Sequence, residues 1–339
     1  MTGCKIYIVK ANTMYDDIDI FGVRLFELLI NEFQDAALVV DAETEIDISN
    51  AEVLAVLYTD TPLITREIIN KCFERAVSEP SIMTKIGSGF VKPLRREYCG
   101  VEEANALQVK TLVDVQNLIS IERAKIINRH MENGVVFLDF TTCYIARDAQ
   151  IGAGTIVYPF NYIGNGNVIG ETVKIFPYCD LNCTEIGSGT NVRATYAESA
   201  KVGRNCTLGP YTCLRPGSRI GDNCRVGDFV DIKNSILDTG VKVAHHAYVG
   251  DSQVGANSNV GCGTVFANYD GKVKRSVVIG KNVFVGCNSN LIAPLTVDDN
   301  AYIAAGSTVT QHVPGKSLCI ARARQVNKPE YPHPKQEKT

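Results

Sequence analysis

The sequence predicts a small α/β domain followed by a parallel β-helix, and two observations carry this prediction. From Ile151 to Val309 a branched aliphatic residue returns every six positions over long stretches. Over residues 1–104 apolar strand-like runs instead alternate with amphipathic helix-like segments. A six-residue period fits neither an amphipathic helix nor a simple antiparallel strand and is typical of a hexapeptide β-helix, whereas the alternation is typical of an α/β sheet.

Residues 1–104 are expected to form a Rossmann-like α/β domain. The runs KIYIVKA and AALVV predict strands, and IDIFGVRLFELLINEF predicts a helix. The stretch EVLAVLYTDTPLITREIINKCFERA predicts a strand, a turn and a second helix. Strands that alternate with helices in this way favour a sheet covered by helices.

A linking helix is expected within residues 105–136. The charged stretch KPLRREYCGVEE predicts a linker, and a helix follows it from about Val109 to Asn133. Leu112, Val115 and Ile119 have the spacing of one helix face, and Gly134 is a suitable stop after the last turn.

Residues 137–318 are expected to form the β-helix. Three runs keep the six-residue period: Ile151, Val157, Ile163, Ile169 and Ile175; Val202, Leu208, Leu214, Ile220, Val226 and Ile232; and Ile279, Val285, Leu291, Val297, Ile303 and Val309. Glycine pairs such as Gly152-x-Gly154 fall at the repeat corners and predict turns rather than a dinucleotide-binding loop. The segment NYDGKVKRS interrupts the period and predicts a projecting loop, either functional or a harmless insertion.

Composition narrows the classes of function. The net charge of −3 and the pI near 6.0 argue against a general nucleic-acid or anionic-membrane surface. The first apolar run is too short for a signal peptide, and no run has the length of a membrane span. The 12 cysteines are scattered without a C-x-x-C motif, which predicts a cytoplasmic protein without a cysteine metal site.

Two adjacent histidines are candidates for a catalytic base. His245 and His246 lie in VAHHAYVG, and an imidazole is well matched to accept a proton from a reacting amine near neutral pH. Neighbouring residues of a strand point to opposite faces, so we expect only one of the two to serve in this way. The alternative for either is a polar residue on an exposed strand.

Three stretches carry a resemblance to a known family: LRPGSRIGDNCRVGDFVDIKNS, AHHAYVGDSQVGANSNVGCGTVFANYDGKVKRSVVIGKNVFVG and NLIAPLTVDDNAYIAAGSTVT. They resemble the bifunctional N-acetylglucosamine-1-phosphate uridyltransferase/glucosamine-1-phosphate N-acetyltransferase family, from the linking helix to about Arg324. The resemblance implies a trimeric, left-handed β-helix that acetylates glucosamine-1-phosphate with acetyl-CoA. This is a step towards UDP-N-acetylglucosamine and the cell wall.

The resemblance also assigns site residues. His245 matches the catalytic histidine in the pattern small–His–x–x–Tyr–x–Gly–Asp, and His246 is then structural. The sugar-phosphate positions are matched by Arg215, Lys233, Tyr248, Asn259 and Lys274. The acetyl-CoA positions are matched by Asn268, Tyr269, Cys262, Cys287, Ala305 and Arg322.

The sequence departs from the family at three of the positions near the ligands. Cys262 and Cys287 replace the usual Ala and Ser, and Asp231 replaces a Glu beside the sugar site, which leaves the identity of the sugar open. The alternative for the cationic side chains is a solvated surface. The basic, proline-rich tail over 319–339 could reach the phosphates of coenzyme A.

The N-terminal domain departs from the family. VLYTDTPLI resembles the strand that carries a magnesium-binding aspartate, here Asp60, but KIYIVKANTMYDDID lacks the glycine-rich nucleotide loop. The second magnesium ligand has no counterpart beyond Lys110, and the domain is much shorter than usual. We therefore expect a truncated, degenerate uridyltransferase domain, no required metal, and Asp60 as a vestigial ligand. Three alternatives stay open: another amino-sugar acceptor, a non-catalytic scaffold or regulatory homologue, and residual nucleotide binding.

Overall fold

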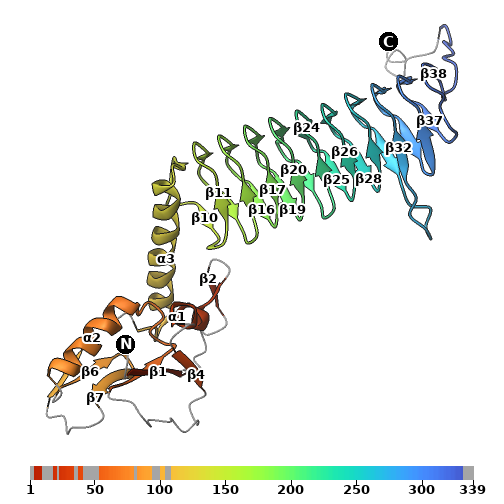
Figure 1. Cartoon of the computed structure of the whole chain (residues 1–339). Helices are drawn as coiled ribbons and strands as arrows, with labels where there is room; N and C mark the ends of the chain where they lie inside the picture. Colours follow the sequence, from red (N-terminus) through yellow and green to blue (C-terminus); the bar gives the residue numbers. More distant parts are fainter. Residues whose placement is uncertain are drawn as a thin grey trace, which may run out of the picture. The chain divides into compact units, whose positions relative to one another are not determined.

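The computed structural model describes residues 4–9, 18–20, 23–33, 37–40, 53–79, 82–93, 100–103 and 108–330. The chain divides into two compact units, 1–133 with 144–149 and 134–143 with 150–339 (Figure 1). Residues 94–99 of the predicted linker and residues 331–339 of the tail lie outside the described residues.

A mixed sheet forms the centre of the first unit, and the strand-like runs predict three of its strands, at Cys4–Val9, Ala37–Val40 and Val53–Tyr58. The other three strands are not predicted, and Gly100–Glu103 is a strand within the predicted linker. Its strands lie in the order β4 (Ala37–Val40), β1 (Cys4–Val9), β5 (Val53–Tyr58), β7 (Gly89–Pro93), β6 (Ile82–Ile86) and β8 (Gly100–Glu103). β1 pairs in parallel with β4 and β5, whereas β7 pairs antiparallel with both β5 and β6. The short strands β2 (Asp19–Ile20) and β3 (Val23–Arg24) pair separately. The parallel strands β4, β1 and β5 agree with the predicted Rossmann-like domain, because that topology is built on a parallel sheet.

Two helices supply the core of this unit. α1 (Leu25–Phe33) buries Leu29 and Phe33, and α2 (Arg66–Ser78) buries Ile69, in one cluster with the inward side chains of the mixed sheet. The side chain of Thr65 accepts a hydrogen bond from the backbone N–H of Ile68 and so caps α2. The predicted α/β domain is thus confirmed, and this core lies between the sheet and these helices. The helix predicted from IDIFGVRLFELLINEF begins only at Leu25, because β2 and β3 occupy part of the preceding stretch.

The linking helix α3 (Leu112–Glu132) begins later than predicted, because Thr111 and Asp114 form a capping box at its start. Val109 instead packs beside Leu28, and Leu112 is 65% exposed, so the expectation that Leu112 lies on the apolar face is wrong. The buried face is carried by residues further along the helix, among them Val115. The last strand of this unit is β10 (Tyr144–Ile145).

The second unit is a parallel β-helix of three sheets, in agreement with the six-residue period (Figure 1). Sheet 1 contains β9 (Val136–Phe137), β12 (Ile156–Val157), β15 (Lys174–Ile175), β18 (Asn191–Val192), β21 (Thr207–Leu208), β24 (Arg225–Asp228), β27 (Lys242–His245), β30 (Asn259–Val260), β33 (Phe284–Val285), β36 (Tyr302–Ile303) and β38 (Leu318–Cys319). Each strand hydrogen-bonds to the strand one coil before it and one coil after it.

The two other sheets repeat the same stacking. Sheet 2 contains β13 (Tyr162–Ile163), β16 (Asp180–Asn182), β19 (Tyr196–Glu198), β22 (Cys213–Leu214), β25 (Asp231–Lys233), β28 (Tyr248–Gly250), β31 (Val265–Ala267), β34 (Asn290–Ile292) and β37 (Thr308–Val309). Sheet 3 contains β11 (Gln150–Ile151), β14 (Val168–Ile169), β17 (Glu185–Ile186), β20 (Lys201–Val202), β23 (Arg219–Ile220), β26 (Ile236–Leu237), β29 (Gln253–Val254), β32 (Val277–Ile279) and β35 (Leu295–Val297).

The core of the β-helix contains the residues that the period predicts, together with others between the predicted runs, such as Leu181 and Val249. Every member of the three periodic runs is buried, from Ile151 to Val309. Glycines and asparagines turn the corners; Gly154 has φ +71°, and a Cβ on Gly152 would lie 2.6 Å from the carbonyl carbon of Gly170. The predicted corner turns are therefore confirmed, since a left-handed φ and a close neighbouring backbone both favour glycine.

The interruption of the period is a loop, as predicted. Asp270 accepts hydrogen bonds from the backbone N–H groups of Lys272 and Val273, and Gly271 has φ +96°. An isolated antiparallel bridge joins Tyr269 to Lys274, so the loop is a small hairpin that projects from the β-helix (Figure 1). Within the described part of the chain, no helix is long and apolar enough to cross a membrane.

Candidate active site

A histidine–aspartate pair lies on two neighbouring strands of sheet 1. Asp228 ends β24, His245 ends β27, and the two residues are register partners. Nδ1 of His245 lies 2.5 Å from Oδ1 of Asp228. This hydrogen bond lowers the pKa of Asp228 below its ordinary value, so the carboxylate acts only as an acceptor. Nδ1 therefore carries the proton, and Nε2 is the nitrogen that can accept one.

His246 does not lie on the opposite face of the same strand, so that part of the sequence prediction is wrong. β27 ends at His245, and His246 turns the corner with φ +37°. Both side chains are exposed. The ring of His246 stacks on Phe229 with centroids 4.8 Å apart, and Phe229 stacks on Tyr211 in turn. Alternation fails here because it holds only within a strand.

A charged cluster lies on sheet 2, and we use this name for Arg215, Asp231, Lys233, Tyr248 and Lys274. Nε and Nη2 of Arg215 lie 3.0 and 2.9 Å from the two carboxylate oxygens of Asp231. The guanidinium carbon of Arg215 lies 5.9 Å from the ring centroid of Tyr248. Asp231 and Tyr248 are register partners on consecutive coils, so the stacking of the coils brings these side chains together.

The projecting loop adds Lys274, the third cation of this cluster, to Arg215 and Lys233. The ammonium group of Lys274 lowers the pKa of Lys233 below its usual value, because two like charges are held close together. Lys274 also lines a cavity of about 710 Å³, together with Asn234 and Asp251. Two neighbouring ammonium groups beside an arginine favour the binding of an anion such as a phosphate.

Asn268 joins the cluster, whereas Asn259 and Tyr269 do not. Nδ2 of Asn268 lies 3.5 Å from the hydroxyl of Tyr248, a member of the cluster, and 2.5 Å from a carboxylate oxygen of Asp251. Asn259 starts β30 in sheet 1, on a different sheet from the charged cluster. The hydroxyl of Tyr269 donates to the carbonyl oxygen of Gly271 within the loop.

A column of equivalent corner positions continues from the catalytic candidate. Val243, Val260, Val285 and Ile303 are successive register partners in sheet 1, and the residues two positions after them are His245, Cys262, Cys287 and Ala305. We call these four residues the corner column. Hydrogen bonds join its coils, including Asn288 N–H to the carbonyl oxygen of Cys262 at 2.7 Å. Nη1 of Arg322 donates to the carbonyl oxygen of Ala305 at 2.8 Å.

Asp60 lies among polar side chains of neighbouring segments, without a cluster of acidic or histidine metal ligands in the described part of the chain. Oδ2 of this buried carboxylate accepts hydrogen bonds from Ser88 and Gln108, at 2.7 and 2.6 Å. Among the described residues no group of three potential ligands surrounds a common point. The backbone N–H of Lys110 instead donates to Asp114 at the start of α3. Oδ2 of Asp60 therefore links the end of β5 to neighbouring segments, whereas its buried Oδ1 has no hydrogen-bond partner among the described residues.

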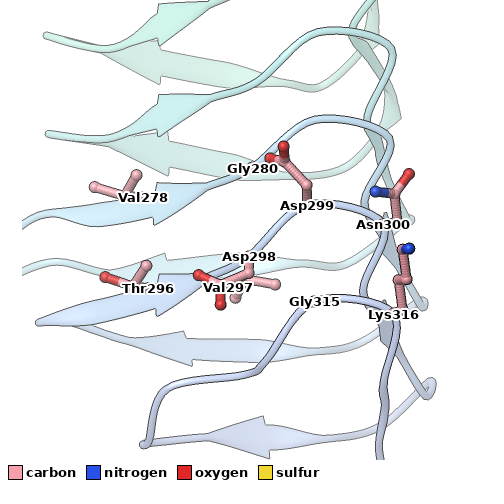
Figure 2. Close-up of a pocket in the computed structure, with 9 residues that line it drawn as sticks. All are labelled: Val278, Gly280, Thr296, Val297, Asp298, Asp299, Asn300, Gly315 and Lys316. Carbon is pink, nitrogen blue, oxygen red and sulfur yellow. The ribbon is translucent and has the colours of Figure 1, made fainter.

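A separate cavity of about 620 Å³ lies along sheet 3 and contains none of the predicted site residues (Figure 2). Figure 2 shows the carboxylates of Asp298 and Asp299 along it. Asp298 pairs with His312 at 2.9 Å, and Asp299 accepts the backbone N–H of Lys281 at 2.7 Å. Both carboxylates are therefore bonded to other groups of the β-helix. Because this cavity also contains no predicted site residue, we place the candidate site at His245.

Asp228 is the site residue that sequence reasoning missed. It lies 17 residues before His245, which in this fold is one coil. Residues one coil apart in the sequence become neighbours on adjacent strands of the β-helix. A search of the sequence for polar residues one coil before His245 would therefore have found Asp228.

Comparisons with known proteins define the class of the β-helix. The model described as GMPPB C-terminal domain matches residues 193–268, which include both Asp228 and His245. The model of the bacterial transferase hexapeptide (six repeats) matches residues 276–311. The second unit is therefore a hexapeptide-repeat β-helix of the transferase type.

The chain is related to the bifunctional protein GlmU. It is 41% identical to GlmU of Brevibacillus brevis over 234 residues, 69% of this chain and 51% of the relative. It is 47% identical to GlmU of Clostridium novyi over 207 residues, 61% of this chain and 45% of the relative. The chain thus spans about half the length of the curated relatives it matches. LpxA of Acinetobacter baumannii, a solved structure, is 18% identical with a TM-score of 0.31, over 54% of this chain and 70% of LpxA.

Proposed function

We propose that this protein is a coenzyme A-dependent N-acetyltransferase that acts on glucosamine-1-phosphate, and that it has no uridyltransferase activity. The pairing of His245 with Asp228, on a β-helix that also carries the charged cluster, is the observation that carries the proposal. A scaffold protein would need neither a histidine with a fixed tautomer nor two crowded lysines. The relationship to GlmU supports the same reaction.

In the proposed reaction the neutral amine of the sugar attacks the thioester carbonyl of acetyl-CoA. Nε2 of His245 accepts the proton that the amine loses, and the carboxylate of Asp228 stabilises the imidazolium that forms. When the tetrahedral intermediate collapses, the imidazolium returns this proton to the departing sulfur, so coenzyme A leaves as the thiol and His245 is again neutral. The cations of the charged cluster hold the phosphate of the acceptor, and this fixes the amine relative to His245.

The acyl donor is proposed to lie along the corner column. The thioester must come within reach of His245, and Cys262, Cys287 and Ala305 continue the line of coils from that residue. Arg322, which donates to Ala305, is a candidate partner for the coenzyme A phosphates.

We further propose that the protein is a cytoplasmic homotrimer. Asn259 lies on a different sheet from the charged cluster, so we propose that Asn259 of a neighbouring copy completes the sugar site.

The test is a thiol-release assay with acetyl-CoA and glucosamine-1-phosphate. We expect His245→Ala to lower kcat by about 100-fold or more, because the base is lost. His246→Ala is the matched control, since it removes the adjacent histidine whose ring stacks on Phe229, and it should keep most of the activity. The absence of turnover with any amino-sugar phosphate would overturn the function. Unchanged turnover by His245→Ala would overturn the mechanism.

One observation favours a second acceptor. The fork of Arg215 is occupied by Asp231, whose side chain is shorter than the Glu that the family resemblance leads one to expect. A different space beside Arg215 would suit another amino-sugar phosphate or a nucleotide-linked amino sugar. A panel of such acceptors in the same assay distinguishes the two, because the true acceptor gives the highest kcat/KM.

A further inference from the structure

Two exposed cysteines lie at the same position of consecutive coils. Val260 pairs with Val285 in sheet 1, and Cys262 and Cys287 each follow two residues later. The hydrogen bond from the N–H of Asn288 to the carbonyl oxygen of Cys262 shows that the coils stay in register at this corner. Neighbouring strands are about 4.8 Å apart, so the Cα atoms of the two cysteines have about this separation.

We infer that Cys262 and Cys287 form a dithiol that closes to an intramolecular disulfide by exchange with low-molecular-weight disulfides. The thiolate of one cysteine attacks a sulfur of the reagent, forms a mixed disulfide and releases one reagent thiol. The second thiolate then attacks the protein sulfur of the mixed disulfide and releases the second reagent thiol. The protein loses two electrons and two protons, and the reagent gains both.

The spacing makes this bond reversible. A Cα separation of about 4.8 Å lies within the range of disulfides, which extends from about 4.4 to 6.8 Å. Side chains at equivalent positions of stacked coils run in the same direction, so their Cβ atoms stay further apart than the preferred distance of about 3.8 Å. The closed form is therefore strained, and strained disulfides are the ones that cellular thiols reduce readily.

Exposure separates this pair from a second pair with the same spacing. Cys206 and Cys224 are also adjacent in register, since each lies one residue before the partners Thr207 and Arg225. Their exposed fractions are only 1% and 2%, and each Sγ lies within hydrogen-bond distance of a carbonyl oxygen. A reagent cannot reach the buried pair, so it is an internal control within the same chain.

The disulfide would lie next to the proposed acyl donor. Cys262 is one coil from His245 in the corner column, so closure of the pair changes the surface on which the thioester must lie. This consequence rests on the proposed function, whereas the reactivity of the dithiol does not. A bound acyl-CoA should in turn shield both thiols.

The experiment treats the reduced, full-length protein with oxidised glutathione and maps the disulfides by peptide mass spectrometry, with and without acetyl-CoA. We expect a link between Cys262 and Cys287 that dithiothreitol removes, while Cys206 and Cys224 stay reduced. At about ten times its dissociation constant, acetyl-CoA should slow formation of the link about tenfold. Cys262→Ser should stop at a mixed disulfide on Cys287.

Cys183→Ser is the matched control, because Cys183 is exposed but its register neighbours are Asn165 and Ser199. This variant should form the link at the wild-type rate. Mixed disulfides on both cysteines without a link would overturn the dithiol. A link that forms equally fast with acetyl-CoA would overturn its placement beside the donor. Acetyl transfer by the reduced protein, measured separately, decides the proposed function itself.

Discussion

At the scale of single residues, the chemistry of the site depends on which nitrogen of one imidazole carries a proton. Asp228 accepts from Nδ1 of His245, and this leaves Nε2 as the acceptor for the amine proton. Both side chains are partly open to solvent, at 52% and 32% exposure, so the base can reach a bound amine. Asp228 is thus a positioning residue that acts through His245.

Asp228→Asn should reveal this role. An amide can donate to Nδ1 and so favour the tautomer with its proton on Nε2, which cannot accept one from the amine. We expect kcat to fall about 10- to 100-fold while KM for both substrates stays near the wild-type value. Steady-state kinetics of the acetyl transfer measure the split. Asp222→Asn is the control, since Asp222 pairs with Arg204 on another corner; an equal loss in both variants would contradict the role of Asp228.

At the scale of elements, the helix and the coils owe their stability to different polar groups. α3 buries Glu122, which pairs with Lys125 at 3.0 Å and also with Arg147. It also buries His130, whose Nε2 has no hydrogen-bond partner among the described residues. The coils instead use buried asparagines: Asn167 donates to two carbonyl oxygens and accepts the N–H of Thr184.

His130 should make α3 sensitive to acid. Burial lowers the pKa of His130 from 6.5 to about 4, so the unfolded chain binds a proton in this interval and the folded chain does not. Stability is therefore complete above about pH 6.5 and falls as the pH drops to about 4, by about 3 kcal/mol. Denaturation followed by the helical circular dichroism signal measures this slope, and His130→Leu should flatten it. The exposed His312 provides the control His312→Gln; a slope unchanged in His130→Leu would refute the assignment.

Asn167→Ala should weaken the β-helix. It leaves the buried N–H of Thr184 and the carbonyl oxygens of Gly164 and Leu181 without this partner, at a cost of about 1–3 kcal/mol. Thermal unfolding followed by the strand signal of circular dichroism measures the loss. Asn165→Ala, an exposed corner residue of the same coil, should melt with the wild type. Equal melting of Asn167→Ala and wild type would show that these bonds contribute little.

At the scale of the whole molecule, the two units differ in the functional groups that they retain. In the β-helix, the stacking of successive coils forms the His245–Asp228 pair, the charged cluster and the corner column. In the described part of the first unit, the carboxylate of Asp60 is instead bonded to Ser88 and Gln108. The sequence of this unit also lacks the glycine-rich loop that would bind a nucleotide phosphate.

We therefore expect no uridylyl transfer. Without phosphate-binding amides or a metal charge, little stabilises the charge that develops on a transferring phosphoryl group. Pyrophosphate release from UTP and N-acetylglucosamine-1-phosphate, with magnesium present, should stay at background. Acetyl transfer by the same preparation shows that the protein is folded. Robust release of pyrophosphate would prove the degenerate-domain prediction wrong.

The sequence by itself determined the architecture of the second unit. The six-residue period named the core from Ile151 to Val309, because each repeat buries its aliphatic residue in the same local way. It likewise indicated the corner glycines and the loop at Asp270-Gly271. The apolar spacing predicts a start of α3 at about Val109, which is too early. The capping box of Thr111 and Asp114 instead sets the start of the helix at Leu112.

Only the tertiary structure decided which residues meet. Asp228 is bonded to His245, and Cys262 and Cys287 follow register partners, because each pair is separated by one coil. The sequence does not indicate such pairs, since the length of a coil varies along the chain. His246 leaves the strand because the backbone turns a corner there, which the alternation of neighbouring residues could not indicate. A repeat specifies what is buried through local periodicity, whereas contacts across coils depend on register, and hydrogen bonds between the coils set that register.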